Sequence, residues 1–169
     1  MEKTLYCVTY SGPLGFFRPY NSVRDGEPYS YTYIPTSVLD GIEKECELKC
    51  KIARHKLRFD TMCTDFRGGL DNMLPQRRHV LTNVEIVLGF EDKEVRDDIA
   101  KLCIYAGQRE YLLLPKSTAE MTESEFSELL GVETFETDKD NIEGVFCGFN
   151  RQRNNERIYV RIDRKEWKL

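Results

Sequence analysis

The strongest strand signal in the chain is VLTNVEIVL at residues 80–88, where β-branched and aliphatic side chains dominate. A second strand pattern precedes it at residues 51–60, and residues 91–105 follow it with apolar side chains at helical spacing. Further outward, residues 4–10 alternate apolar and aromatic side chains with other strand formers, which predicts a first strand. Residues 111–114 predict a short last strand.

Two capping boxes mark expected helix starts. Ser37 and Asp40 stand in N-cap and N3 positions, which predicts that a helix begins at Ser37, and an apolar stripe at helical spacing follows to Cys46. Gly41 inside this stripe costs about 1 kcal/mol against alanine, which would be tolerated if the helix must approach a strand closely. A shorter helix is expected after Thr122, where Thr-Glu-Ser-Glu forms the second box.

The order strand, helix, strand, strand, helix, strand is the split βαβ pattern, so the predicted fold class is α+β and ferredoxin-like. We expect this domain at residues 1–115, with a long irregular connection or a short β-arm at residues 20–36 and a loop at residues 61–76. Residues 116–169 are expected to form an extension packed on it, made of a helix and a C-terminal β-hairpin around Asn154 and Asn155.

Charge is unevenly distributed along the 169 residues. The formal total of −4 argues against a strongly basic nucleic-acid protein. However, residues 49–80 carry eight basic and three acidic side chains, and residues 144–169 carry seven and three, which gives +5 and +4. Residues 81–143 carry six basic and sixteen acidic side chains, a net of −10. The two basic segments predict either one positive face, if the fold joins them, or two solvated basic faces.

The cysteines, the histidines and the first ten residues indicate the cellular compartment and the cofactors to expect. The six cysteines show no CxxC spacing, and residues 1–10 have neither the basic region nor the apolar stretch of a signal peptide, so we expect free, mostly buried thiols and a cytoplasmic location. His55 and His79 are the only imidazoles, so no metal or cofactor is expected. No apolar run reaches the roughly 18 residues of a membrane span, so no membrane partner is expected.

Four local patterns follow one another along the chain. A Gly-Pro-aromatic loop ends in Arg-Pro at residues 12–19, and a Ser-Tyr, Pro-Thr, Ser-x-x-x-Gly-Ile segment spans residues 30–42. Gln-Arg-x-x-x-Leu-x-x-Val enters the main strand at residues 76–84. A Gly-x-Arg-Glu turn at residues 107–110 precedes Gly-Phe-Asn at residues 148–150. In this order the patterns resemble the Cas five subunits of type I CRISPR systems, nearest to the type I-C form.

The resemblance implies a RAMP fold, a ferredoxin-like (RRM-type) domain related to RNA-recognition modules. It also implies partners, because this family grips the 5′ handle of the guide RNA (crRNA) and contacts the Cascade backbone and large subunits. Gripping RNA needs cations for phosphates and flat side chains for bases. The candidate RNA-binding residues are Phe16, Phe17, Arg18, Tyr31, Tyr33, Lys51, Arg54, Lys56, Arg77, Arg78 and Arg109.

The tyrosines at 29, 31 and 33 alternate, so on an extended arm they share one face that RNA bases can stack on. The alternative is an arm that packs its tyrosines on its own domain. For Arg77 and Arg78 the alternative is solvated charge at the end of a strand.

Type I-C relatives also cut precursor RNA without metal, through a Tyr, Lys and His arrangement. Here the matching stretch at residues 43–50 has no tyrosine and places Glu47 near that position, and residues 91–98 hold Lys93 but no histidine. A carboxylate near the cut repels phosphate, so we expect no RNA cutting by the family's mechanism. The chain is also shorter than type I-C relatives usually are.

Three functions are compatible with these residues. The first is a compact, non-cutting Cas five subunit that holds guide RNA in a Cascade complex. The second is a Cas five mimic carried by a phage or another mobile element, which acts as an anti-CRISPR by blocking Cascade assembly or interference. The third is a metal-independent endoribonuclease that uses a displaced residue set, such as Tyr33 with His79.

Overall fold

The computed structural model describes residues 2–18, 27–67, 76–150 and 153–165. In chain order the elements are β1 (Thr4–Gly15), α1 (Thr36–Glu45), β2 (Arg54–Arg58), β3 (Met62–Arg67), β4 (Gln76–Phe90), α2 (Lys93–Ile99), β5 (Ile104–Tyr105), β6 (Leu112–Thr122), α3 (Glu123–Glu128), β7 (Gly131–Thr137), β8 (Val145–Asn150) and β9 (Glu156–Lys165). Residues 19–26, which hold part of the predicted arm, lie outside the described ranges.

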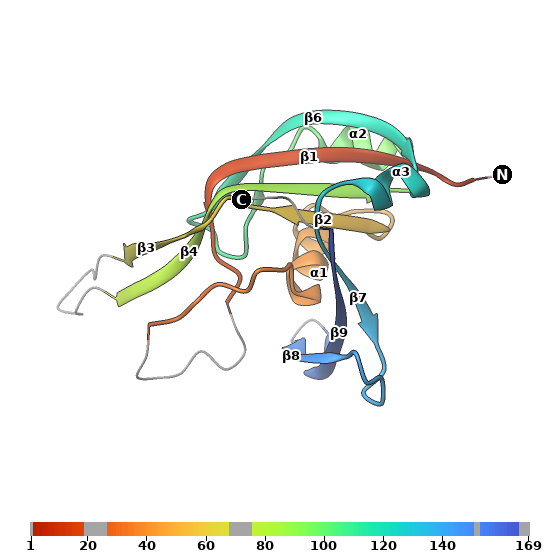
Figure 1. The fold of residues 1–169 in the computed structure, drawn as a ribbon. Coiled ribbons are helices and arrows are strands. Elements are labelled where there is room, and N and C mark those ends of the chain that lie inside the picture. The colour runs from red at the N-terminus through yellow and green to blue at the C-terminus, as the bar shows by residue number, and fades with distance from the viewer. Residues whose placement is uncertain (1, 19–26, 68–75, 151–152, 166–169) are drawn as a thin grey trace.

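The sheet confirms the predicted fold class. Its central strands run in the order β6-β1-β4-β2, and each neighbouring pair is antiparallel. Helix α1 connects β1 to β2, α2 lies between β4 and β6 along the chain, and β4 separates the two strands that α1 joins. This is the split βαβ arrangement of ferredoxin-like domains. Figure 1 shows β3 and the start of β4 projecting from one end of the sheet, and β7, β9 and β8 turning away from it.

Side chains alternate between the two faces of the sheet, as the period of a strand requires. Val8 and Ile86 belong to the main cluster, which also takes in buried residues of α1 and α2. Their chain neighbours Cys7 and Val87 pack instead with Phe126 of α3. The strands are therefore covered by α1 and α2 on one face and by α3 on part of the other.

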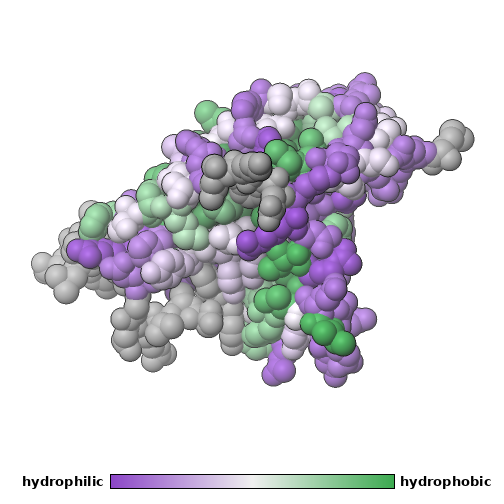
Figure 2. All heavy atoms as spheres, in the orientation of Figure 1, coloured by the Kyte–Doolittle hydropathy of each residue, from purple (hydrophilic) through white to green (hydrophobic). Residues whose placement is uncertain are grey.

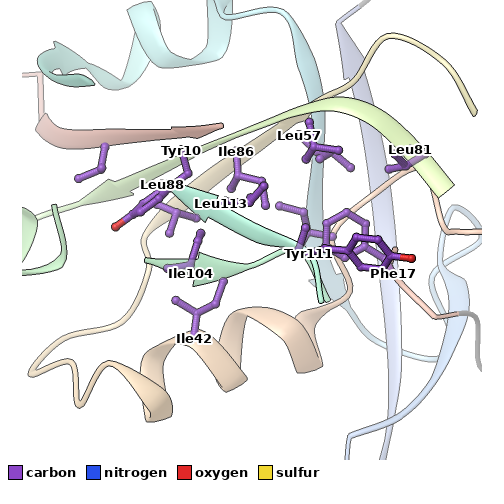
Figure 3. Packing of buried hydrophobic residues seen from close by; sticks show 14 of the residues in the cluster. Tyr10, Phe17, Ile42, Leu57, Leu81, Ile86, Leu88, Ile104, Tyr111 and Leu113 are labelled. Atoms are coloured by element: carbon purple, nitrogen blue, oxygen red, sulfur yellow. The ribbon is translucent and has the colours of Figure 1, made fainter. Parts of the chain in front are cut away.

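Helix α1 is anchored by one apolar contact region. Figure 3 shows Ile42 pointing from α1 toward Ile104 of β5, beneath the buried side chains of the central strands. Burying an isoleucine of this kind stabilises the fold by about 1.5–3 kcal/mol. The contact sets α1 beside β5 and the turn that follows it.

Strand β4 bends, and this creates a feature that the sequence did not predict. Asn83 has a left-handed φ of 48°, and the register of β4 with β1 skips one residue on each strand there. The half of β4 after this bend pairs with β2, whereas the half before it pairs with β3. The loop predicted at residues 61–76 is therefore wrong for Met62–Arg67, a mixed polar strand without an apolar alternation to reveal it.

Two helices differ from the predictions, and the start of a third is confirmed. Helix α1 begins at Thr36 after Pro35, without a side-chain cap, because the Asp40 carboxylate binds the Arg153 guanidinium instead of closing a capping box. Helix α2 spans only Lys93–Ile99, and Asp92 caps it by accepting a hydrogen bond from the Glu94 amide. The box at Thr122 is confirmed, since both of its hydrogen bonds are present at the start of α3.

The C-terminal hairpin is confirmed as β8 and β9, but the sequence missed β7, which extends the sheet from β2 through the pair Leu57 and Val132. These strands form a separate apolar cluster with Tyr33. Figure 2 shows hydrophobic residues exposed over this region. Val145 of β8 is one of the large hydrophobic side chains that are exposed. The expected boundary after residue 115 falls inside β6, and the division into two domains stays a prediction.

Three observations bear on the expectations about membranes, metals and thiols. Within the described ranges, no helix is long and apolar enough to cross a membrane. Over the same residues, no group of three His, Cys, Asp or Glu side chains is placed to hold a metal ion. All six cysteines are free thiols, although only Cys7 is fully buried and Cys103 is exposed.

Candidate nucleic-acid interface

A groove of about 630 Å³ lies between α1 and the turn that follows β5. Arg18 comes from the Gly-Pro-aromatic pattern, Gly41 from the Ser-x-x-x-Gly-Ile pattern, and Gly107 and Arg109 from the Gly-x-Arg-Glu turn. Three stretches far apart in the sequence therefore meet in one cavity. We call this cavity the α1 groove.

The wall formed by Gly107 depends on a close approach between two backbones. The Phe16 amide donates a hydrogen bond to the Ala106 carbonyl, with 3.0 Å between N and O. Gly107 has a left-handed φ of 85°, and a Cβ atom there would lie 2.3 Å from the Phe16 carbonyl oxygen. Only glycine fits this position, so the turn holds Arg109 in a fixed place relative to Arg18.

Arg78 connects the remaining pattern, residues 76–84, to the same turn. Its guanidinium donates to Gln108 Oε1 at 2.8 Å and to Asp65 Oδ2 at 3.2 Å, and it lies 4.8 Å from the ring centre of Tyr111. The Tyr111 hydroxyl donates to the same Asp65 carboxylate at 2.9 Å. Arg78 is almost completely buried, so it positions the turn and does not offer its charge at the surface.

Gly41 has a different role from the one that its sequence context predicted. A Cβ atom at Gly41 would meet no atom within 4 Å, so no strand approaches the helix closely there, and that reason for a glycine does not apply. Gly41 instead lines the α1 groove, where the missing side chain leaves helix backbone open to a ligand.

The side chains around the groove suit a phosphate-containing ligand. Arg18, Lys44 and Arg109 are exposed and line it, and Glu45 is the acidic residue among the lining side chains. Guanidinium and ammonium groups bind phosphate oxygens through charge-assisted hydrogen bonds. The thiols of Cys46 and Cys103 also line the groove. The groove therefore combines cations with partly apolar surface, which suits an anionic ligand better than an apolar small molecule.

Arg54 and Lys56 have a structural role instead of the predicted exposed one. The Arg54 guanidinium donates two hydrogen bonds to the Glu133 carboxylate, one of them at 2.7 Å to Oε2, and the Lys56 ammonium lies 3.6 Å from the same group. Lys56 and Glu133 are buried, and Arg54 also lies over the rings of Phe126 and Phe135. Both cations are therefore engaged with Glu133 inside or near the core, which leaves them poorly placed to bind an external anion.

The predicted stacking residues are also mostly internal. Phe16 and Phe17 are 2% and 0% exposed, because β1 continues to Gly15 and the loop turns both rings into the core. Tyr33 is buried and Tyr31 half-buried, and their rings stack with 4.6 Å between the centres. The alternative of an arm packed on its own domain therefore holds for these two tyrosines. Tyr29 differs, since it is 58% exposed.

The other candidate cations stay at the surface. Arg77 is exposed at the start of β4, and Lys51 is exposed in the segment before β2. Lys51 does not line the α1 groove, whereas Arg18 and Arg109 do. Among the predicted charges, the structure thus brings Arg18 and Arg109 together and leaves Arg77 and Lys51 elsewhere on the surface.

His55 is held as a neutral hydrogen-bond acceptor. Burial, and then the charges of Arg54 and Lys56, lower the pKa of His55 to about 3. The Thr134 amide donates to its Nε2 atom at 3.1 Å, which requires that this nitrogen carry no proton. His55 therefore joins β2 to β7 inside the fold and does not reach a surface site.

The displaced pair Tyr33 and His79 is not assembled in the described contacts. Burial raises the pKa of Tyr33 well above its ordinary value, and its ring packs with Tyr31 and the β7–β9 cluster. His79 stacks on Tyr29 and lies 2.9 Å from Glu27 Oε2. The two side chains thus take different partners.

The exposed ring of Phe66 is not among the predicted residues, because the sequence predicts a loop where β3 lies. Gln108, which receives the hydrogen bond from Arg78, is not among them either. No sequence signal marked Phe66, because Met62–Arg67 is a mixed polar stretch without apolar alternation and its pairing with residues 76–81 is visible only in the fold. Nothing in the sequence marked Gln108, whose role depends on a contact across 30 residues.

No protein-family model matches the chain, and no curated protein is similar to it in sequence. Among solved structures, a chain of a CRISPR RNA-guided surveillance complex superimposes with a TM-score of 0.57 at 14% identity, covering 96% of this chain and 90% of that one. A CRISPR-associated protein superimposes with a TM-score of 0.53 at 14% identity, covering 98% and 93%. At this identity the likeness shows the fold: nearly the whole chain has the architecture of these CRISPR-associated proteins.

Proposed function

We propose that this chain is a Cas five-like subunit of a CRISPR surveillance complex and that it grips the 5′ handle of the guide RNA in the α1 groove. The observation that carries the proposal is the convergence of the four family-like patterns. Parts of three of them line the groove, and the pattern at residues 76–84 supplies Arg78, which fixes the turn at Gln108, whereas Gly-Phe-Asn at residues 148–150 lies in β8 outside the groove. Patterns that serve only packing have no reason to meet at one open cavity.

The charges of the groove support RNA as its ligand. Arg18, Lys44 and Arg109 are exposed around it in a protein whose formal charge is −4. A local cluster of cations binds a polyanion even when the whole molecule is acidic, because screening confines the interaction to roughly 8–10 Å at physiological salt. The similarity in fold to a chain of an RNA-guided complex supports the same proposal.

The proposed subunit holds RNA without cutting it. The end of α1, where the family places its tyrosine, carries Glu47 with a left-handed φ of 51°. His55 is buried and His79 lies beside Glu27. We expect purified protein to leave a cognate repeat hairpin intact in the absence of divalent ions, and cleavage under those conditions would contradict this part of the proposal.

A binding experiment tests the groove. R18E and R109E each place a carboxylate where the proposal has a phosphate, and we expect each to weaken binding of handle RNA by about tenfold or more. The matched control is K139E, because Lys139 is exposed and lies outside the α1 groove. Equal affinities of R109E and K139E for handle RNA, measured by fluorescence anisotropy, would contradict the proposal.

A cell experiment separates the subunit from the decoy. The chain is expressed in cells with a working type I-C system whose own Cas five gene is intact or deleted. Restored interference in the deletion strain is the expected result. Loss of interference in the intact strain, without rescue of the deletion, would instead assign the chain to the anti-CRISPR class.

A further inference from the structure

The end of the sheet beyond the bend in β4 presents an aromatic face. Residues 28–30 pair with one edge of β4, through hydrogen bonds from the Ser30 amide to the His79 carbonyl and from the His79 amide to the Pro28 carbonyl. Strand β3 pairs with the other edge, and there Phe66 lies opposite Arg77. Arg77 and His79 are two residues apart on one strand, so their side chains share a face.

Four side chains make up this surface, which we call the ribbon face: Tyr29, Phe66, Arg77 and His79. The Tyr29 ring is stacked on His79, with 4.2 Å between the ring centres and 11° between the planes. The Arg77 guanidinium lies 5.5 Å from the ring centre of Phe66. Tyr29 and Phe66 are 58% and 57% exposed, so each ring has a surface open to a ligand.

An anionic group already occupies the cationic side of the ribbon face. The Glu27 carboxylate lies 2.9 Å from His79 Nε2 and 3.5 Å from Arg77 Nη1. Two oxygens of one anion thus reach two donors next to the exposed rings. The same donors can bind two oxygens of a phosphate.

The ribbon face fits a nucleotide better than a protein surface. The aliphatic residues of this part of β4, Val80 and Leu81, are 0% exposed and add nothing to the surface. The apolar area of the ribbon face therefore comes from aromatic rings. A protein partner needs a packed apolar centre, whereas an unstacked base needs a flat ring and a nearby cation.

We propose that the ribbon face binds one unstacked base of single-stranded RNA against Tyr29 or Phe66, while an adjacent phosphate replaces the Glu27 carboxylate on Arg77 and His79. The inference rests on the proposed function for the identity of its ligand as RNA. It adds a second contact, separate from the α1 groove, and it gives Glu27 the role of an internal competitor. The ribbon face therefore reads no handle sequence and accepts any single-stranded RNA.

Stacking is tested with Y29A and F66A in anisotropy titrations against a uridine oligonucleotide of about ten nucleotides. Loss of one stacked base lowers affinity by about 5- to 150-fold. Y29F and F66Y keep the rings and should keep the affinity. I142A is the matched control, since Ile142 is fully exposed in the β7–β8 connection. Circular dichroism and the melting temperature confirm that each variant is folded.

Phosphate exchange is tested with E27Q and R77A. E27Q removes the competing charge, so we expect it to raise the affinity for the uridine oligonucleotide by a few-fold. R77A should reduce the slope of log affinity against log salt by about 0.7, the value for one phosphate on a single strand. Unchanged affinity in E27Q together with an unchanged slope in R77A would overturn the exchange with Glu27.

The outcomes separate this inference from the proposed function. Unchanged RNA affinity in folded Y29A and F66A, with weaker binding in R18E and R109E, would overturn the ribbon face alone. Weaker binding in Y29A and F66A, with no preference of the wild-type protein for handle RNA over an unrelated strand, would overturn the handle proposal alone. Ribbon variants that bind RNA normally but lose association with a Cascade subunit would show a protein interface instead.

Discussion

The basic segment at residues 49–80 divides into two regions with opposite uses of positive charge. On β2, Arg54 and Lys56 are matched by the buried Glu133 carboxylate. On β4, the Arg77 side chain is 61% exposed and its anionic neighbour Glu27 is 42% exposed. The comparison shows that a basic run in the sequence does not identify an RNA contact: a distant carboxylate, here across 79 residues, decides which cations are available.

The largest expected effect is the loss of stability when the buried Glu133 charge is removed. E133Q leaves Arg54 and Lys56 without their counter-ion inside the fold, so we expect the free energy of unfolding to fall by about 3–5 kcal/mol. Urea denaturation measures it. The control is E85Q, because Glu85 pairs with the more exposed Arg58 and Lys116 and should cost about 1 kcal/mol or less. Equal losses in both variants would contradict the larger cost expected for the buried carboxylate.

A pH dependence follows from His55, which lies between Arg54 and Lys56 on β2. Its pKa of about 3 in the folded chain compares with 6.5 ordinarily, so below pH 6.5 the unfolded chain binds a proton that the folded chain does not. The free energy of unfolding should therefore fall by about 1 kcal/mol from pH 7 to about pH 5.5.

H55Q provides the reference for this measurement, since its amide oxygen can accept from the Thr134 amide without titrating. The difference between wild type and H55Q in urea midpoints at the two pH values isolates the histidine. A pH dependence identical in both proteins would show that His55 titrates normally in the folded state.

Substitutions of Gly41 test whether the exposed α1 groove holds the RNA. G41A should raise the free energy of unfolding by up to about 1 kcal/mol, because alanine is the better helix former and its Cβ meets no atom. G41L should leave stability unreduced but fill the α1 groove and weaken binding of handle RNA. A G41L protein that binds this RNA as tightly as wild type would place the ligand elsewhere.

The smallest expected effects concern single charges. R77A should keep the stability of the wild type, because Arg77 is exposed and its ion pair with Glu27 is long at 3.5 Å. R78A should lower it, since Arg78 is buried between Asp65, Gln108 and Tyr111. The melting temperatures of R77A and R78A measure both effects. Equal stability of both variants would contradict the division between a positioning arginine and a ligand-facing one.

The sequence was most informative where local patterns dominate. The β4 run, the capping box at Thr122 and the β8–β9 hairpin carry their own signals, and all three are confirmed. The sites depended on long-range contacts. Phe17 looked like a loop residue until the core enclosed it, and Lys56 looked free until Glu133 paired with it. Arg18 and Arg109 were each identified, but only the fold places them around one groove.

The most direct test of the central claim is to map where handle RNA lies. RNA carrying 4-thiouridine is cross-linked to the purified chain, and the modified peptides are identified by mass spectrometry. Handle RNA in the α1 groove should cross-link at Tyr105 or at the thiols of Cys46 and Cys103, which line it. Cross-links confined to β2 or to the β7–β9–β8 strands, with none in the peptides that line the groove, would contradict the claim.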